Sequence, residues 1–240
     1  MKRQSIGFLL ALIASSAFAL DAVHTPAGDE GPAQTAIAPP KGPGPVVLVL
    51  SGIDGPGRYE WLAKDVAGLG YYVVLLDGND VFSRQKDGAA NLRKAMERAQ
   101  HSPHAMPGKS AVIGLSLGGG AAIAYAATML ERVSAVVAFY PMTSFTPDIS
   151  VVARRFKLPV LVLTGAADTH NNCCLVESMR RIESAAREIN AAFELVVYPY
   201  GKHVFNINGP NYQRDYEQDS WTRTVEMLRK HQPLPAVRQN

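Results

Sequence analysis

The sequence predicts an α/β fold with a doubly wound, mostly parallel sheet and helices on both faces. Continuous apolar runs of strand length, such as Val46–Leu50, are typical of strands that are buried on both faces. Helical stretches take turns with these runs along the chain, as crossover connections between parallel strands require. The sequence has no internal repeat, and residues 141–157 are the only candidate for a lid, too short to be a substantial one.

The expected strands and helices alternate along the chain, except that no helix is expected between the strands at 133–139 and 159–164. The predicted strands cover residues 46–50, 71–76, 110–114, 133–139, 159–164 and 193–198. The predicted helices cover residues 59–69, 87–100, 118–129, 175–189 and 212–230. Together they define one domain over residues 46–230, which is long enough to bury a well-filled core.

The flanking segments are expected to lack regular structure. Residues 20–45 are rich in Pro, Gly and Ala without periodicity, which predicts an arm on the surface. Regular structure is therefore expected to start at Val46. The polar residues 231–240 predict a flexible tail.

Residues 1–19 have the organisation of a secretory signal peptide. A basic start is followed by an apolar run over residues 6–14 and by Ala-Phe-Ala, which predicts cleavage after Ala19. A membrane anchor is the alternative, but the run is shorter than the about 20 apolar residues that span a bilayer. We expect a periplasmic or secreted protein without stable membrane insertion.

The charge balance indicates no nucleic-acid partner. The chain carries 24 basic and 21 acidic residues. Removal of the predicted signal peptide leaves 22 against 21. No basic field remains that would bind a phosphate backbone. The oligomeric state cannot be predicted from these numbers.

The most informative segment is the Gly-x-Ser-x-Gly motif at residues 114–118. It follows an apolar strand and opens a helix of small residues, which is the context of a nucleophile elbow. Gly114 and Gly118 leave room for the sharp bend, and Ser116 stands at its tip. The positive end of the helix faces any oxyanion formed there.

A serine nucleophile needs a base and a group that orients the base. In open α/β sheets both come from the carboxyl ends of strands. Asp168 follows the strand at 159–164, and His203 follows the last strand, so the chain order is Ser, Asp, His. Asp148 is the reserve acid. His170 lies too close to Asp168 in sequence to bridge it to Ser116, and the remaining histidines lie in the arm, a polar loop and the tail: His24, His101, His104 and His231.

The oxyanion hole requires two backbone N–H groups. Leu117 supplies one because it follows the nucleophile. We assign the second to Ile53, in the glycine-containing loop after the first strand. No metal or organic cofactor is needed for this chemistry.

Two adjacent cysteines, Cys173 and Cys174, form neither a disulfide framework nor a zinc site. In an oxidising compartment they form a strained vicinal disulfide or remain two small buried thiols. The sequence leaves both alternatives open.

These motifs resemble the dienelactone hydrolase family of the α/β-hydrolase superfamily over residues 45–230. The strongest matches are the elbow at Ser116, the Gly-x-x-Asp segment that ends at Asp168 and the Gly-x-His-x-Phe segment around His203. The resemblance implies an α/β-hydrolase fold, and Ser116 at the nucleophile position indicates esterase-like chemistry. The chain resembles a member of this family in which a serine, Ser116, stands where the family has a nucleophilic cysteine.

The resemblance also implies positions for substrate contacts. Gly52 stands where the family has a glutamate, Arg84 matches one of the two arginines that bind the substrate carboxylate, and Ile207 replaces the other. The lidless scaffold is also similar to cutinase-like enzymes with an aromatic-lined groove. Among the available aromatic residues we assign Tyr59 and Tyr140 to substrate binding; the others are Trp61, Phe82, Phe145 and Tyr200.

The sequence thus predicts a secreted serine hydrolase that cleaves carboxylic ester bonds of small or surface-accessible substrates. A thioester, lactone or acetyl-glycan hydrolase with the same triad is one alternative. A non-catalytic periplasmic binding scaffold is the other, because a fold does not fix a function.

Overall fold

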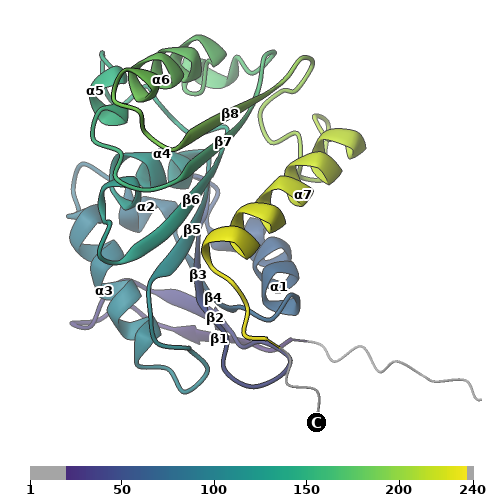
Figure 1. The fold of residues 1–240 in the computed structure, drawn as a ribbon. Coiled ribbons are helices and arrows are strands. Elements are labelled where there is room, and N and C mark those ends of the chain that lie inside the picture. Colours follow the sequence, from purple (N-terminus) through teal and green to yellow (C-terminus); the bar gives the residue numbers. More distant parts are fainter. Residues whose placement is uncertain (1–19, 237–240) are drawn as a thin grey trace, which may run out of the picture.

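A computed structural model describes residues 20–236 of the chain. Eight strands form one sheet in the order β1-β2-β4-β3-β5-β6-β7-β8 (Figure 1). The six strands from β3 onward are parallel: β3 (Val46–Leu50), β4 (Tyr72–Leu76), β5 (Ser110–Leu115), β6 (Val133–Phe139), β7 (Val160–Gly165) and β8 (Phe193–Tyr198). The doubly wound, mostly parallel sheet is therefore confirmed.

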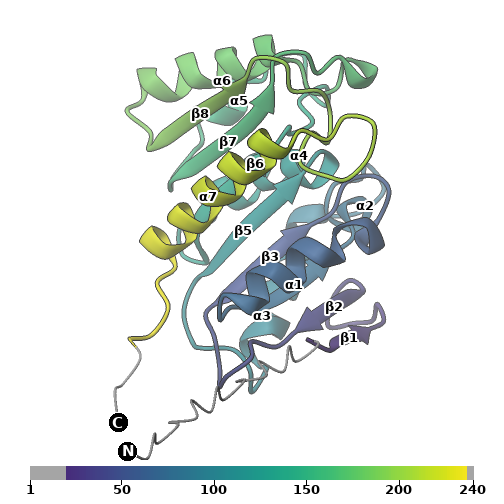
Figure 2. The ribbon, with the colours of Figure 1, turned by 90° about the vertical axis from the view of Figure 1, so that its right-hand side faces the viewer.

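Helices cover both faces of the sheet, as Figures 1 and 2 show. On one face lie α1 (Glu60–Gly68) and α7 (Arg214–His231). On the other lie α2 (Gly78–Val81), α3 (Gly88–Gln100), α4 (Leu117–Ala124), α5 (Ser150–Ala153) and α6 (Val176–Glu188). The short helices α2 and α5 were not predicted, and the expected helix over 118–129 divides into α4 and the 3-10 turn η2 (Ala126–Thr128).

The two helical layers explain why the strands are apolar without alternation. Every residue of β3 is buried. Val46, Leu48 and Leu50 face the core beneath α3 and α4, whereas Val47 and Val49 face the core beneath α1 and α7. Successive side chains of a strand point to opposite faces, so a strand between two helical layers needs an apolar residue at every position.

The prediction of an unstructured arm over residues 20–45 is wrong. Residues 22–37 contain β1 (Ala22–Thr25) and β2 (Gln34–Ile37), which pair with each other in antiparallel register. β2 also pairs antiparallel with β4 and covers its edge. Ile37 is fully buried in the core on the α1 side. These strands are four residues long, and Pro and Gly residues lie between and after them. Their pairing therefore depends on the edge that they cover rather than on a local pattern.

The predicted tail is also partly ordered. α7 extends to His231, and the next residue, Gln232, is buried. Its side-chain amide donates to the backbone oxygen of Lys109 at 2.7 Å. The expected signal peptide, residues 1–19, and the last residues, 237–240, lie outside the described part of the chain. Within residues 20–236 no helix combines the length and apolar composition that crossing a membrane requires.

Candidate active site

Ser116 occupies a sharp turn between β5 and α4. Its backbone has φ 51° and ψ −112°, a conformation that is strained for a residue with a side chain. Its N–H donates to Phe139 O at 3.0 Å, and its carbonyl accepts from the N–H groups of Gly120 and Met142, both at 2.9 Å. These three hydrogen bonds to separate elements hold the strained turn and present the hydroxyl at the carboxyl edge of the sheet.

The two glycines of the motif are required by close backbone contacts. A Cβ at Gly114 would lie 2.3 Å from the carbonyl oxygen of Gly118. A Cβ at Gly118 would lie 2.3 Å from the carbonyl oxygen of Leu50. Both distances are shorter than any non-bonded carbon–oxygen contact, so β3, β5 and α4 can meet in this way only without side chains at these positions.

The structure brings Ser116, His203 and Asp168 together in one row. His203 Nε2 lies 3.0 Å from Ser116 Oγ, and His203 Nδ1 lies 2.7 Å from Asp168 Oδ2. All three residues are buried, with Asp168 only 2% exposed. This is the geometry in which a carboxylate orients an imidazole and the imidazole accepts the serine proton.

The loop that carries His203 is held by its neighbours. Ala167 N–H donates to Gly201 O at 3.0 Å, which ties the aspartate loop to the histidine loop. Asn211 Nδ2 donates to the His203 carbonyl at 3.0 Å. The position of the imidazole therefore follows from contacts to both sides of its loop, and not from the triad alone.

The two assigned oxyanion donors belong to adjacent backbone segments. Gly118 N–H donates to Ser51 O at 3.0 Å, which joins the start of α4 to the loop after β3. Asn79 Nδ2 donates to the carbonyl of Ile53 at 3.1 Å and orients that loop. Among the described residues, no hydrogen bond uses the N–H of Leu117 or of Ile53. Both are available to a substrate oxygen.

The prediction that Tyr140 and Tyr59 contact substrate is wrong, because both are buried. The Tyr140 ring packs edge-on against His203 with centroids 4.8 Å apart, and its hydroxyl donates to Asn206 Oδ1 at 2.9 Å. Burial raises the pKa of Tyr140 well above its ordinary value. Burial, aided by the charge of Asp54, raises the pKa of Tyr59 to about 12. Both phenols are therefore neutral near pH 7, and Tyr140 packs directly against the imidazole of His203.

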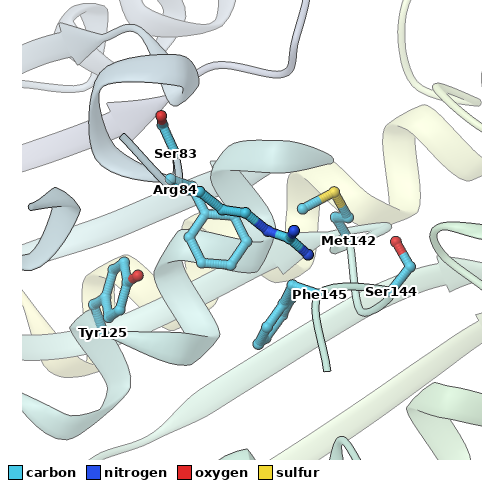
Figure 3. A pocket seen from close by; sticks show the side chains of 7 residues that line it. Ser83, Arg84, Tyr125, Met142, Ser144 and Phe145 are labelled. Carbon is cyan, nitrogen blue, oxygen red and sulfur yellow. The ribbon is translucent and has the colours of Figure 1, made fainter. Parts of the chain in front are cut away.

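Arg84 points into a pocket of about 430 Å³ beside the nucleophile turn (Figure 3). Its lining residues are Phe82, Ser83, Arg84, Tyr125, Met142, Ser144 and Phe145. Met142 is the residue whose N–H donates to the Ser116 carbonyl, so the pocket adjoins the elbow. Two of the aromatic residues considered for a groove, Phe82 and Phe145, line it with their rings 4.9 Å apart. The role of Arg84 in substrate binding stays a prediction.

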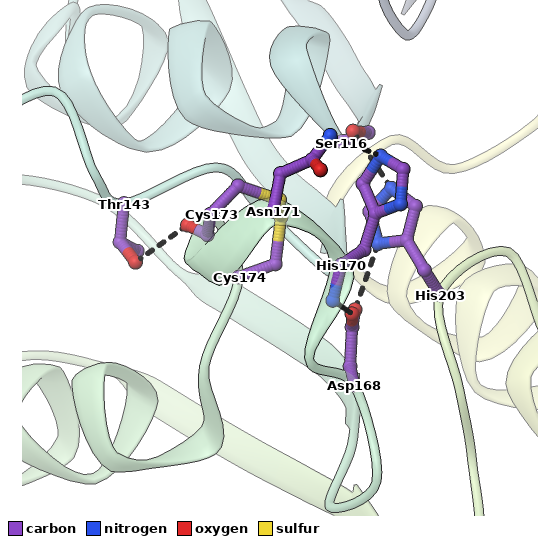
Figure 4. The surroundings of a disulfide bond; sticks show 8 residues. All are labelled: Ser116, Thr143, Asp168, His170, Asn171, Cys173, Cys174 and His203. Atoms are coloured by element: carbon purple, nitrogen blue, oxygen red, sulfur yellow. Dashed lines mark hydrogen bonds and ion pairs between the residues drawn. A yellow bond between two sulfur atoms is a disulfide. The ribbon is translucent and has the colours of Figure 1, made fainter.

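Cys173 and Cys174 form a vicinal disulfide next to the triad (Figure 4). The two sulfur atoms and a ring nitrogen of His203 lie within 4.8 Å of one another. Two cysteine thiolates and a histidine at this spacing could ligate a metal ion, but the two sulfur atoms are bonded to each other in the disulfide. Cys173 O accepts hydrogen bonds from Thr143 N at 2.7 Å and from Thr143 Oγ1 at 3.1 Å.

The contact of His170 with the catalytic imidazole was not predicted from the sequence. It does not bridge Asp168 to Ser116, as expected, but its ring stacks on His203 with centroids 4.4 Å apart and an interplanar angle of 9°. No motif signals this contact, because it depends on the path of the chain between Asp168 and the cysteines. The reserve acid, Asp148, is exposed and accepts hydrogen bonds from Ser150, which lower its pKa.

Comparison with known proteins identifies the family. The model of the dienelactone hydrolase family matches residues 79–232, which include Ser116, Asp168 and His203. A relative named "Putative carboxymethylenebutenolidase", from Yersinia pestis, is 32% identical over 236 residues and is matched over 85% of either chain. The chain belongs to the dienelactone hydrolase family.

Solved structures of similar proteins share the fold. The crystal structure titled "Putative Dienelactone Hydrolase", from Klebsiella pneumoniae, has a TM-score of 0.73 at 24% identity, covering 87% of this chain and 98% of that one. Esterase 2 of Thermogutta terrifontis, phosphorylated by paraoxon, has a TM-score of 0.68 at 18% identity, covering 90% of this chain and 95% of that one. The α/β-hydrolase fold is thereby confirmed.

This dienelactone hydrolase family member departs from the expected substrate contacts in a way that the structure explains. At Gly52, the position that the resemblance matches to the family's glutamate, a Cβ would lie 2.2 Å from the Tyr59 hydroxyl, so the space is already occupied. Ile207, in place of an arginine, is 6% exposed and packs in the core on the α1 side. Arg84 therefore lacks a second arginine at that position.

Proposed function

We propose that this chain is a serine hydrolase that cleaves carboxylic ester bonds through an acyl-enzyme. The observation that carries the proposal is the row of Ser116, His203 and Asp168, with contacts of 3.0 and 2.7 Å. Family membership gives the hydrolase class, and the serine at the nucleophile position supports esterase chemistry.

The reaction follows from this row. Ser116 Oγ attacks the ester carbonyl carbon while His203 Nε2 takes the hydroxyl proton. Asp168 holds the ring by Nδ1 and stabilises the imidazolium. The tetrahedral intermediate collapses, and His203 gives the proton to the alcohol oxygen as the carbon–oxygen bond breaks. Water then attacks the acyl-enzyme by the same route, which releases the acid and restores the Ser116 hydroxyl.

Backbone N–H groups stabilise the negative charge that develops on the carbonyl oxygen. In this proposal the N–H groups of Leu117 and Ile53 donate hydrogen bonds to the negative oxygen of each tetrahedral intermediate. Loss of one such donor typically costs about 3 kcal/mol of transition-state stabilisation. The start of α4 contributes a favourable dipole at the same point.

The pocket with Arg84 supports a small substrate. Its aromatic walls suit an apolar acyl or alcohol group, and the guanidinium suits a carboxylate or another anionic group. A lactone is the second candidate, because the Yersinia pestis relative carries the name of a lactone-cleaving enzyme. A panel of nitrophenyl esters, lactones, thioesters and acetylated glycans separates these bonds by their kcat/KM values.

A fluorophosphonate probe tests the proposal directly. We expect one adduct per folded chain, located at Ser116 by peptide mass spectrometry, and no adduct on Ser116→Ala. The exposed Ser184 of α6 gives a matched control, and Ser184→Ala should label like the wild type. Unlabelled wild-type protein without esterase activity would refute the hydrolase proposal and favour a binding scaffold.

We further propose that the protein is secreted or periplasmic. The signal-peptide pattern at residues 1–19 and the vicinal disulfide support an oxidising compartment. Fractionation of cells that express the full chain tests this, together with mass measurement of the mature protein. A chain that retains residues 1–19 in the cytoplasm contradicts it.

A further inference from the structure

His170 is the feature of the site that the proposed mechanism leaves unused. It is an exposed residue of the 3-10 turn η3 (His170–Asn172), two positions after Asp168. Its ring lies flat on the ring of His203, with centroids 4.4 Å apart (Figure 4). A second imidazole in this position covers part of the catalytic ring that water would otherwise reach.

The backbone of His170 contacts Asp168, the carboxylate that orients His203. Its N–H donates to Asp168 Oδ1 at 3.1 Å, while Asp168 Oδ2 faces His203 Nδ1 at 2.7 Å. Each carboxylate oxygen therefore has its own partner, and the carboxylate cannot rotate without losing both. One residue thus contacts the acid through its main chain and the base through its side chain.

The segment that carries His170 is anchored on its far side. Asn171 and Asn172 both have positive φ, and the disulfide between Cys173 and Cys174 follows them directly. Thr143 donates two hydrogen bonds to Cys173 O. The residue before Thr143 is Met142, whose N–H donates to Ser116 O at 2.9 Å. These hydrogen bonds therefore connect the segment that carries His170 to the turn that carries Ser116.

We propose that His170 is a positioning residue, whose ring keeps the imidazole of His203 turned toward Ser116, and that the Cys173–Cys174 disulfide holds His170 in place. This inference rests on the proposed hydrolase function. A catalytic imidazole that must accept and return a proton gains rate from a locked orientation, because small displacements of a reacting group lower the rate strongly.

Substitution of His170 tests the inference. Aromatic pairing of this kind corresponds to about a 2- to 13-fold effect on an equilibrium or rate. We expect His170→Ala to lower kcat for a nitrophenyl ester by roughly this factor with KM unchanged. His170→Phe keeps a flat ring and should restore kcat. His24→Ala, which removes an exposed histidine on β1, serves as the matched control and should match the wild type.

A spectroscopic measurement separates this inference from the proposed function. The proton between His203 Nδ1 and Asp168 should give a far-downfield resonance in the proton NMR spectrum of the wild type. We expect His170→Ala to shift or broaden it and His170→Phe to retain it. This readout needs no substrate, so it remains decisive if the wild type hydrolyses none of the esters.

The disulfide is tested by combining variants. If it acts through His170, the Cys173→Ser/Cys174→Ser variant should lower kcat in the same direction, and adding His170→Ala should cause little further loss. Three results overturn the inference: unchanged kcat and resonance in His170→Ala, a His170→Phe variant as impaired as His170→Ala, or fully additive losses in the combined variant.

Discussion

Replacement of Asp168 by asparagine should disable the site through the histidine tautomer, while the packing stays intact. Asp168 is 2% exposed and accepts the His170 N–H on Oδ1. The amide oxygen of Asp168→Asn would take over that contact, because only an oxygen can accept there. The amide NH2 would then face His203 Nδ1 and force the ring proton onto Nε2.

This tautomer cannot serve as the base. Nε2 lies 3.0 Å from Ser116 Oγ and must offer a lone pair to take the serine proton. With the proton already on Nε2, the nucleophile is not activated. The corresponding substitution in a serine protease lowers kcat by about 10⁴, which corresponds to about 5 kcal/mol at 1.36 kcal/mol for each factor of ten.

The assay is the steady-state hydrolysis of a nitrophenyl ester, with fluorophosphonate labelling as a second measure. We expect kcat to fall by about four orders of magnitude in Asp168→Asn, with an unchanged circular dichroism spectrum. Asp148→Asn is the matched control, because Asp148 is an exposed loop aspartate whose carboxylate accepts hydrogen bonds from Ser150 and not from a triad residue. A loss of less than about tenfold in Asp168→Asn would refute the tautomer argument.

Three further predictions concern the elbow, the core and alkaline stability. Gly118→Ala should abolish labelling of Ser116 and lower the Tm, because its Cβ would lie 2.3 Å from the carbonyl oxygen of Leu50; thermal unfolding followed by circular dichroism measures this. Phe205→Ala should lower the free energy of urea unfolding by about 3–5 kcal/mol, because Phe205 is fully buried among three tyrosine rings; an unchanged urea midpoint would contradict this packing. Burial raises the pKa of Tyr59 to about 12 from 10.0, so the stabilising contribution of the neutral phenol is complete below pH 10 and is lost as the pH rises through 12. The free energy of unfolding should therefore fall more steeply between pH 9 and pH 12 in the wild type than in Tyr59→Phe. Urea titrations at each pH measure this difference.

Much of the architecture could be predicted because the signals are local. The parallel strands are continuous apolar runs between helical stretches, and each was predicted to within one or two residues at its ends. The elbow motif also lies within five residues. Asp168 and His203 could be chosen by their place after strands, because a parallel sheet brings those chain segments to one edge.

The parts that could not be predicted depend on contacts between distant segments. Tyr140 follows β6 directly and does lie at the carboxyl edge, but its backbone φ of 35° turns its ring inward beneath His203. The stacking of His170 depends on how the chain winds back between Asp168 and the disulfide. The strand β2 forms because β4 offers an uncovered edge, which no pattern within residues 34–37 reveals.

That pairing also bears on how the protein can be shortened. A recombinant chain beginning at Val46 would contain all the catalytic motifs. It would nevertheless leave the backbone N–H and C=O groups on one edge of β4 without hydrogen-bond partners. Such a side attracts the strand of another molecule and invites aggregation. Variants intended for soluble production should therefore retain the segment from Ala22 to Ile37 as an integral part of the enzyme.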